Sequence, residues 1–197
     1  MCLRRPGCHS SLRKNPRVVP KNRSAQRAGA SERSEEVGLI STPYRYTTIE
    51  MASLIRPHTP IPEQATAIHG ITNDMVSTAP TFKQVWPLLY PLLCLYKVVV
   101  YNAPYDMSII KRLSLSERYT SKNVYADCAM RAYSAYFQEP GFYENGFKWH
   151  KLEVACEHLS VEIDGNSHRS LTDCTSTLGI IRKLRTLYDN RLVEIGA

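Results

Sequence analysis

Asp106 is the first candidate for chemistry, because its carboxylate follows the end of an apolar segment. Residues 97–101 are rich in valine, Asn102 ends this segment, and Asp106 lies four residues later, where Pro104 favours the first turn of a helix. A carboxylate at such a strand-to-helix junction lies near the carboxyl edge of a sheet, where ligand sites of open α/β folds gather. The alternative is a first-turn acid that only complements the helix dipole.

His168 and Asp173 form a second candidate, a histidine followed five residues later by an acid. The same spacing recurs at His69 and Asp74, which we interpret as turn residues, so spacing alone does not select a site. Positions five apart on one helix face directions about 140° apart, so the pair can act together only if His168 lies in a loop and Asp173 on the following helix. Residues 165–167, Gly-Asn-Ser, favour such a loop. Without that geometry His168 is a surface histidine.

Both candidates lie in segments that resemble the motifs of a known enzyme family. Residues 102–106, Asn-Ala-Pro-Tyr-Asp, are similar to N-A-x-F-D, with Tyr105 in place of phenylalanine and Tyr101 where a histidine usually precedes the motif. Residues 168–174, His-Arg-Ser-Leu-Thr-Asp-Cys, are similar to H-R-A-L-x-D-A. These are the second and third motifs of the DEDDh-type 3′-5′ exonucleases, which include polymerase proofreading subunits. The resemblance extends over residues 37–188.

The resemblance implies a fold, a reaction and a role for each candidate residue. The fold is a ribonuclease H-like mixed α/β sheet flanked by helices. The reaction is phosphodiester hydrolysis at the 3′ ends of single-stranded nucleic acid, DNA rather than RNA, with two Mg²⁺ or Mn²⁺ ions. Asp106 and Asp173 would be metal-site carboxylates, which suit these hard ions, and His168 would be the general base. Asn102 and Tyr105 would bind substrate, and a polymerase partner stays undefined.

The first motif of the family, a D-x-E on the central strand, has no counterpart in the sequence. It should come before residues 37–40, yet residues 1–31 contain neither Asp nor Glu. Glu32, Glu35 and Glu36 are spaced by one, three and four positions, so no two of them have the two-position spacing that places the acids of D-x-E side by side on one strand face. We therefore expect the first central strand to be absent or degenerate, through a different natural N-terminus or decay of the gene, and hydrolysis to be strongly reduced.

The distribution of charge separates a basic tail from a nearly neutral body. The chain has 197 residues, 43% of them hydrophobic, and a net charge of +7. Residues 1–36 carry +6 of that charge, and they lack hydrophobic periodicity. We expect a disordered or mis-assigned tail at 1–36 and one exonuclease-like domain at 37–190. The alternative function is a non-catalytic remnant in which the basic tail binds nucleic acid.

The sequence favours a reduced, cytoplasmic compartment and excludes a membrane span. Six cysteines form no CxxC pair, so neither a zinc site nor a disulfide framework is indicated. The longest apolar stretch, 85–96, covers about half of a bilayer and contains two prolines.

The predicted elements follow a mixed α/β order. Strands are expected at 37–42, 46–55, 97–101 (a buried strand) and 123–126. Helices are expected at 62–68, 73–76, 82–92, 152–159 and 170–188. Two further helices are expected, one that begins at 104 and one that follows the last strand and ends at 136. Thr81 is a candidate helix cap, and Asp127 is expected to cap the helix after the last strand. The aromatic segment 140–150 is expected to pack, the alternative being a lip on which bases stack.

Overall fold

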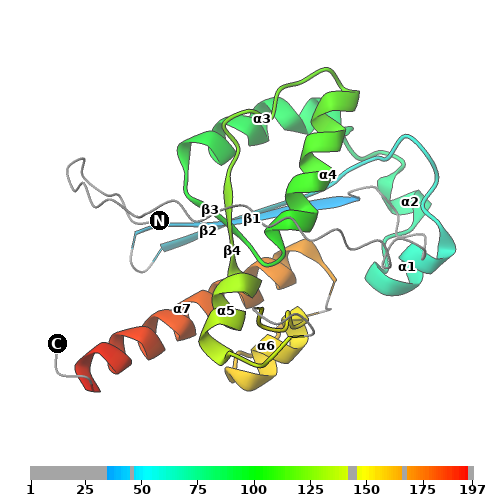
Figure 1. The fold of residues 1–197 in the computed structure, drawn as a ribbon. Helices are drawn as coiled ribbons and strands as arrows, with labels where there is room; N and C mark the ends of the chain where they lie inside the picture. The colour runs from blue at the N-terminus through cyan, green and yellow to red at the C-terminus, as the bar shows by residue number, and fades with distance from the viewer. Residues whose placement is uncertain (1–34, 45–46, 142–145, 166–167, 195–197) are drawn as a thin grey trace.

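The computed structural model describes residues 35–44, 47–141, 146–165 and 168–194. Its elements follow the chain in an alternating order of strands and helices (Figure 1). The elements are β1 Glu36–Tyr44, β2 Thr47–Leu54, α1 Glu63–His69, α2 Asn73–Val76, α3 Phe82–Leu95, β3 Val98–Val100, α4 Ala103–Ser116, β4 Ala126–Cys128, α5 Ala129–Phe137, α6 Leu152–His158 and α7 Ser170–Glu194.

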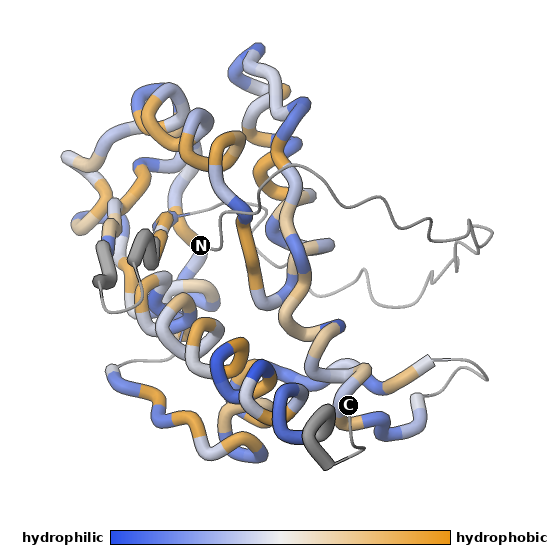
Figure 2. The backbone as a smooth tube through the Cα atoms, turned by 90° about the vertical axis from the view of Figure 1, so that its left-hand side faces the viewer, coloured by the Kyte–Doolittle hydropathy of each residue, from blue (hydrophilic) through white to orange (hydrophobic). Residues whose placement is uncertain are grey.

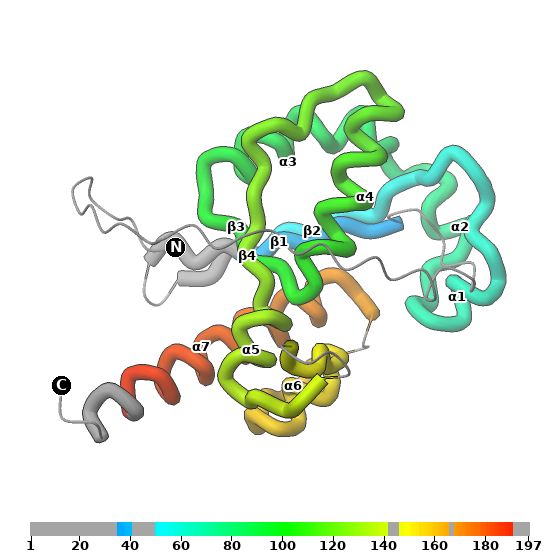
Figure 3. Tube along the Cα trace, in the orientation of Figure 1, coloured from blue at the N-terminus to red at the C-terminus, as the bar shows by residue number. Residues whose placement is uncertain are grey.

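The strands lie between two groups of helices. α3 and α4 lie on one side of the strands, and α5, α6 and α7 lie on the other, as the traces in Figures 1 and 3 show. This layering is the mixed α/β architecture that the sequence predicts. Within the described ranges, no helix combines the length and the apolar content that crossing a bilayer requires.

β1 and β2 form the predicted hairpin. They pair antiparallel, with Glu36 opposite Leu54 and Gly38 opposite Ala52. The side chains of β1 alternate between the two helical layers, because successive residues of a strand point to opposite faces. Val37 packs on the cluster under α3 and α4, whereas Gly38 lies against the start of α7.

β3 and β4 form a second, parallel pair, which lies apart from the hairpin in the hydrogen-bonding pattern. Val98 is opposite Ala126, and Val99 is opposite Asp127. Two predictions about this pair were wrong. Val99 is 37% exposed, so β3 is not fully buried. The fourth strand begins at Ala126 rather than at Asn123, so Asp127 lies inside the strand, where it binds Lys97 at 2.9 Å and does not cap α5.

The helices begin close to the residues predicted from capping signals. Thr81 precedes α3 and donates its backbone N–H to Oε1 of Gln84 at 2.8 Å. The helical spacing of Phe82, Val85, Leu88, Leu89 and Leu92 predicts an apolar face for α3, but Leu88 is 72% exposed, whereas Trp86 is only 2% exposed. α7 extends beyond the predicted end at 188, and hydrophilic residues are frequent along the part of it that Figure 2 colours before the grey end.

Three apolar clusters hold the layers together. The largest lies under α3 and α4, the second joins α5, α6 and α7, and the third lies beneath α1 and α2. Their buried members are Ile55, Phe82, Val85, Trp86, Leu89, Leu93 and Val124 in the first, Tyr133, Ala155, Cys156, Ile180 and Leu184 in the second, and Ile61, Ile71 and Val76 in the third.

Gly38 allows α7 to begin directly on β1. A Cβ atom at this position would lie 2.7 Å from Oγ and 2.8 Å from the carbonyl carbon of Ser170. Real Cβ atoms do not approach a backbone this closely, so any side chain at Gly38 would push the start of α7 away from the strand.

We predict that Gly38→Ala destabilises the protein by about 1–3 kcal/mol, because the added methyl group overpacks a contact with backbone. The free energy of unfolding in urea measures this loss. Ala52→Val is the matched control, since Ala52 is the exposed partner of Gly38 on β2. Equal stability of the two variants would contradict the close approach.

Candidate active site

Asp106 lies in the first turn of α4, directly after β3. Its backbone N–H donates to the carbonyl of Asn102 at 3.2 Å, which fixes the carboxylate at the strand-to-helix junction that the sequence predicts. The side chain is half-buried. The pKa of Asp106 is raised to about 6. Burial is the largest cause, the hydrogen bond from its own backbone N–H opposes the rise, and the negative charge of Asp173 contributes to it.

His168 and Asp173 adopt the arrangement that their spacing requires. His168 precedes α7 with a φ of 65°, which is uncommon for a non-glycine residue, and Asp173 lies in the first turn of the helix. Burial raises the pKa of Asp173, against the opposing hydrogen bond from the backbone N–H of His168. The side chain of His168 is 51% exposed, and its Nε2 atom lies 3.8 Å from Oε1 of Glu153.

The two predicted carboxylates lie close together although they belong to different helices. The charge of Asp173 acts on Asp106, and both act on Cys174. The pKa of the Cys174 thiol is raised to about 11, first by burial and then by the charges of Asp173, Asp106 and Glu36, in that order. The charges of three carboxylates therefore act on Cys174. The carboxylates of Asp106 and Asp173 are therefore near enough for their charges to interact, and their joint role in one site stays a prediction.

Glu36 connects β1 to the start of α7, a role that the sequence does not predict. Its carboxylate accepts two hydrogen bonds from Arg169, at 2.9 and 3.2 Å, and one from the backbone N–H of Ser170, at 2.8 Å. Burial raises the pKa of Glu36, but these hydrogen bonds and the charge of Arg169 outweigh it, so the net shift is downward. The contact fixes the loop that carries His168 to the first residue of β1.

Tyr101, at the position where the family usually has histidine, has a structural role here. Its hydroxyl donates to the carbonyls of His150 and Lys151, at 2.9 and 3.0 Å, and so ties the end of β3 to the start of α6. The neighbouring Asn102 precedes α4 without a side-chain cap. Tyr105 is 47% exposed on the first turn of α4. Substrate binding by Asn102 and Tyr105 stays a prediction.

The aromatic segment divides into a packed and an exposed part. His150 is buried, and its Nε2 atom lies 2.6 Å from Glu139. Trp149 is 53% exposed, and Arg131 lies 5.3 Å from the centre of its ring. Phe142 and Tyr143 lie outside the described residues. Packing therefore accounts for His150, whereas the Trp149 ring is open to solvent.

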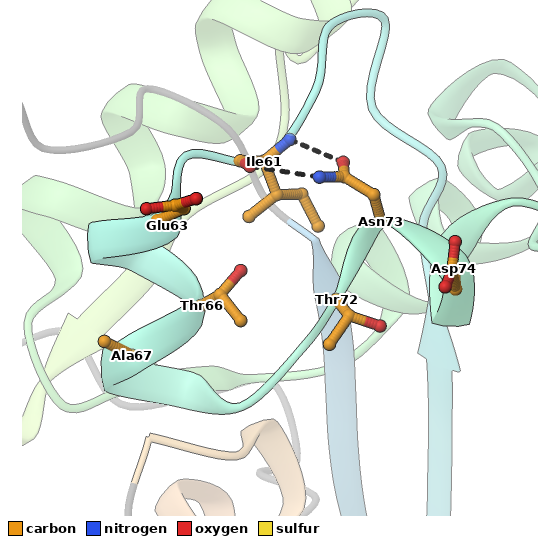
Figure 4. A pocket seen from close by; sticks show the side chains of 7 residues that line it. All are labelled: Ile61, Glu63, Thr66, Ala67, Thr72, Asn73 and Asp74. Carbon is orange, nitrogen blue, oxygen red and sulfur yellow. Dashed lines mark hydrogen bonds between the residues drawn. The ribbon is translucent and has the colours of Figure 1, made fainter.

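Of the second histidine and acid pair, His69 makes a turn contact as predicted, whereas Asp74 lies within α2. Nδ1 of His69 accepts the backbone N–H of Ile71 at 3.0 Å. Asn73 closes the same turn with two hydrogen bonds to the backbone of Ile61, drawn in Figure 4. The hollow in Figure 4 contains none of the site residues predicted from the motifs. Its lining is Ile61, Glu63, Thr66, Ala67, Thr72, Asn73 and Asp74.

Asp106 and Asp173 offer the type of ligand that a divalent cation prefers, but two carboxylates are too few for a two-metal site. Carboxylate oxygens are the ligands that Mg²⁺ and Mn²⁺ prefer. Glu36 is committed to Arg169 and Ser170. Within the residues that the structure describes, no three His, Cys, Asp or Glu side chains gather into a metal-binding group. The described residues therefore do not complete a two-metal site.

Comparison with known proteins agrees with this geometry. A profile of the RNase_T exonuclease family matches residues 29–181. The chain belongs to this exonuclease family. An uncharacterised exonuclease of Escherichia phage 186 is 42% identical over 149 residues, which cover 69% of this chain and 73% of the phage protein. A DNA polymerase III subunit epsilon-like protein of Rhodobacter capsulatus is 28% identical over 147 residues, which are 74% of this chain but only 20% of that protein.

Solved structures of family members share the fold. Exonuclease X in complex with 5′ overhanging duplex DNA superposes with a TM-score of 0.56 at 21% identity, over 78% of this chain and 82% of that one. The nuclease domain of 3′hExo, a DEDDh family member bound to rAMP, superposes with a TM-score of 0.57 at 17% identity, over 79% of this chain and 92% of that one. The DEDDh-type exonuclease family and the ribonuclease H-like fold predicted from the motifs are thus confirmed. The family generally uses divalent metals.

Replacing Glu36 with glutamine tests the contact between β1 and α7. We predict a loss of about 1–2 kcal/mol at pH 7, because the hydrogen bonds to Arg169 lose their charged acceptor. The pKa of Glu36 is below its ordinary 4.5, so its stabilising effect is present above pH 4.5 and disappears as the pH falls through the lowered pKa. The loss should therefore shrink at pH 3, measured by urea unfolding. Glu50→Gln, at an exposed position of β2, should leave stability unchanged; a loss as large in this control would contradict the assignment.

Asp106→Asn should stabilise the metal-free protein at neutral pH. The pKa of Asp106 is raised from 3.8 to about 6, so the folded state binds more protons than the unfolded state in this range, and stability falls as the pH rises through it. We expect the Tm of the variant at pH 8 in EDTA to exceed that of the parent by a few degrees, and the difference to vanish at pH 4. Asp127→Asn, at an exposed position, is the control. A parent more stable than the variant at pH 8 would refute the raised pKa.

Proposed function

We propose that this chain is a metal-dependent 3′-5′ exonuclease domain that acts on the 3′ ends of single-stranded nucleic acid, with DNA as the substrate. The observation that carries the proposal is the meeting of Asp106 and Asp173. Each carboxylate lies in the first turn of a different helix, and their charges interact. A pair of acids at such junctions is suited to a cation that binds phosphate.

The side chains have distinct roles in this proposal. Asp106 and Asp173 would hold Mg²⁺ or Mn²⁺, which supplies positive charge to a phosphodiester. His168 has an exposed imidazole beside Asp173, so its Nε2 atom can take the proton from an attacking water as general base. Asn102 would hydrogen-bond the terminal nucleotide, and the exposed ring of Tyr105 would stack on its base.

DNA as the substrate and the cytoplasm as the compartment are supported by separate observations. One relative resembles a DNA polymerase III epsilon subunit, and exonuclease X was solved with DNA. Another solved relative recognises a histone mRNA stem-loop at its 3′ end, so RNA is the substrate class against which DNA must be tested. The four described cysteines are free thiols, as in a reducing cytoplasm.

We expect the purified chain to release nucleotides from a 3′-labelled single DNA strand in Mn²⁺, slowly because only two carboxylates meet in the described site. Release should fall to the rate in EDTA in Asp106→Asn and in Asp173→Asn, since each removes a ligand charge. Asp127→Asn is the control, because this acid binds Lys97 on the surface. No Mn²⁺-dependent release, or release unchanged in both site variants, would overturn the proposed function.

A further inference from the structure

Trp149 is an exposed aromatic residue whose neighbours on both sides are fixed. The residue is 53% exposed. Before it, the carbonyl of Lys148 accepts the hydroxyl of Ser134 at 2.8 Å, and the Nζ atom of Lys148 lies 2.7 Å from Glu139. After it, His150 is buried, and its Nε2 atom lies 2.6 Å from the same glutamate. The segment that presents Trp149 is therefore held in place, although the side chain itself stays open to solvent.

The guanidinium of Arg131 gives the Trp149 ring a positively charged neighbour. Its Cζ atom lies over the ring, 5.3 Å from the ring centre, which is within the range of a cation–π contact. Arg131 is exposed in the first turn of α5. Among the described residues, no carboxylate forms an ion pair with it. The two side chains, which we call the Trp149 platform, offer a ring for a base and a donor for a phosphate.

Tyr101 connects both halves of the platform to the end of β3. Its hydroxyl donates to the carbonyl of His150, the residue after the tryptophan, at 2.9 Å. Its carbonyl accepts the backbone N–H of Met130, the residue before the arginine, at 2.9 Å. Asp106 lies five residues after Tyr101, in the first turn of α4. Because β3 and β4 are parallel, α4 and α5 both start at their carboxyl edge, so the platform and Asp106 lie at one edge of this strand pair.

The same segment also reaches the histidine of the third motif. Glu153 lies in the first turn of α6, which packs beside α5 (Figure 1), and its Oε1 atom is 3.8 Å from Nε2 of His168. Glu153 follows Trp149 by four positions, and four residues of extended chain span at most about 14 Å. A nucleic-acid strand advances about 3.4 Å or more per nucleotide. The platform is therefore within about four nucleotides of the proposed site.

We propose that the Trp149 platform binds the nucleic-acid strand upstream of its 3′ end. Trp149 stacks on a base within about four nucleotides of the terminus, and Arg131 binds a phosphate beside that base. The inference rests on the proposed function, because this strand is the one whose 3′ end enters the site of Asp106 and Asp173. Every base has a π face, but in a duplex that face is already stacked. The platform therefore selects single strands over duplexes, without preference for sequence.

Tryptophan fluorescence of the full chain tests the proposal in EDTA, where the strand is not hydrolysed. The chain has two tryptophans, and Trp86 is only 2% exposed, so an added strand can stack only on Trp149. A short thymidine strand should quench the emission. The same strand annealed to its complement should not, nor should an abasic strand of the same length and charge. The quenching should disappear in Trp149→Phe, which leaves Trp86 as the only fluorescent indole.

Affinity measurements separate stacking from charge. Trp149→Ala should weaken binding of the thymidine strand about tenfold, and Trp149→Phe should retain most of the affinity, because a phenyl ring still stacks. Arg131→Gln should lower the slope of log affinity against log salt concentration by about 0.7, the effect of one phosphate contact in a single strand. Tyr125→Ala is the matched control, since Tyr125 is 79% exposed but lies at the amino end of β4. It should change neither quantity.

The position of the stacked base is tested in Mn²⁺ with phosphorothioate linkages, which resist hydrolysis. An abasic strand with thymines only in about the last four nucleotides before its 3′ end should quench like the full thymidine strand. One with thymines only at its 5′ end should not. Equal quenching by the two would refute the placement upstream of the terminus.

Equal affinity of Trp149→Ala and the parent, or equal quenching by thymidine and abasic strands, would overturn the inference. The proposed function fails separately. Binding that depends on Trp149 without Mn²⁺-dependent nucleotide release would refute the exonuclease and keep the platform. Nucleotide release with the same affinity and rate in Trp149→Ala as in the parent would keep the exonuclease and refute the platform.

Discussion

The Glu36 carboxylate joins the first described strand to the last helix, and the geometry of the candidate site depends on this contact. Its oxygens bind the guanidinium of Arg169 and the backbone N–H of Ser170, so they occupy the start of α7, where a helix favours negative charge. The adjacent Gly38 lets the helix lie directly on the strand. His168 and Asp173 take their positions from this junction. Asp106 reaches the same point independently, from the end of β3.

The features that the sequence predicts well are those that depend on neighbours along the chain. Thr81 and Gln84 mark the start of α3 because their contact spans one turn. The segments 102–106 and 168–174 each contain their whole local geometry, a strand end or a loop followed by a helix. Features set by distant partners were missed or misplaced. β4 is shifted because it pairs in register with β3, which puts Asp127 opposite Val99 and beside Lys97. Tertiary pairing outweighs local propensity there.

Glu36 shows the same limit at the site itself. Its partner Arg169 lies 133 positions away in the sequence, and no spacing rule connects them. From the sequence alone Glu36 was the last residue of an acid-poor tail; in the fold it anchors the loop of the third motif. Its carboxylate is bound by Arg169 and by the backbone N–H of Ser170.

The central claim is that Asp106 and Asp173 make one acidic site for a divalent cation. Paramagnetic broadening of backbone amide signals during a Mn²⁺ titration tests it most directly, because the effect falls steeply with distance from the ion. If the two acids share one ion, signals of residues 102–107 and 168–174 broaden first and together, and Asp173→Asn abolishes both effects. Broadening centred instead on the acidic rim of Glu63 and Asp74, or confined to one of the two segments, would contradict it.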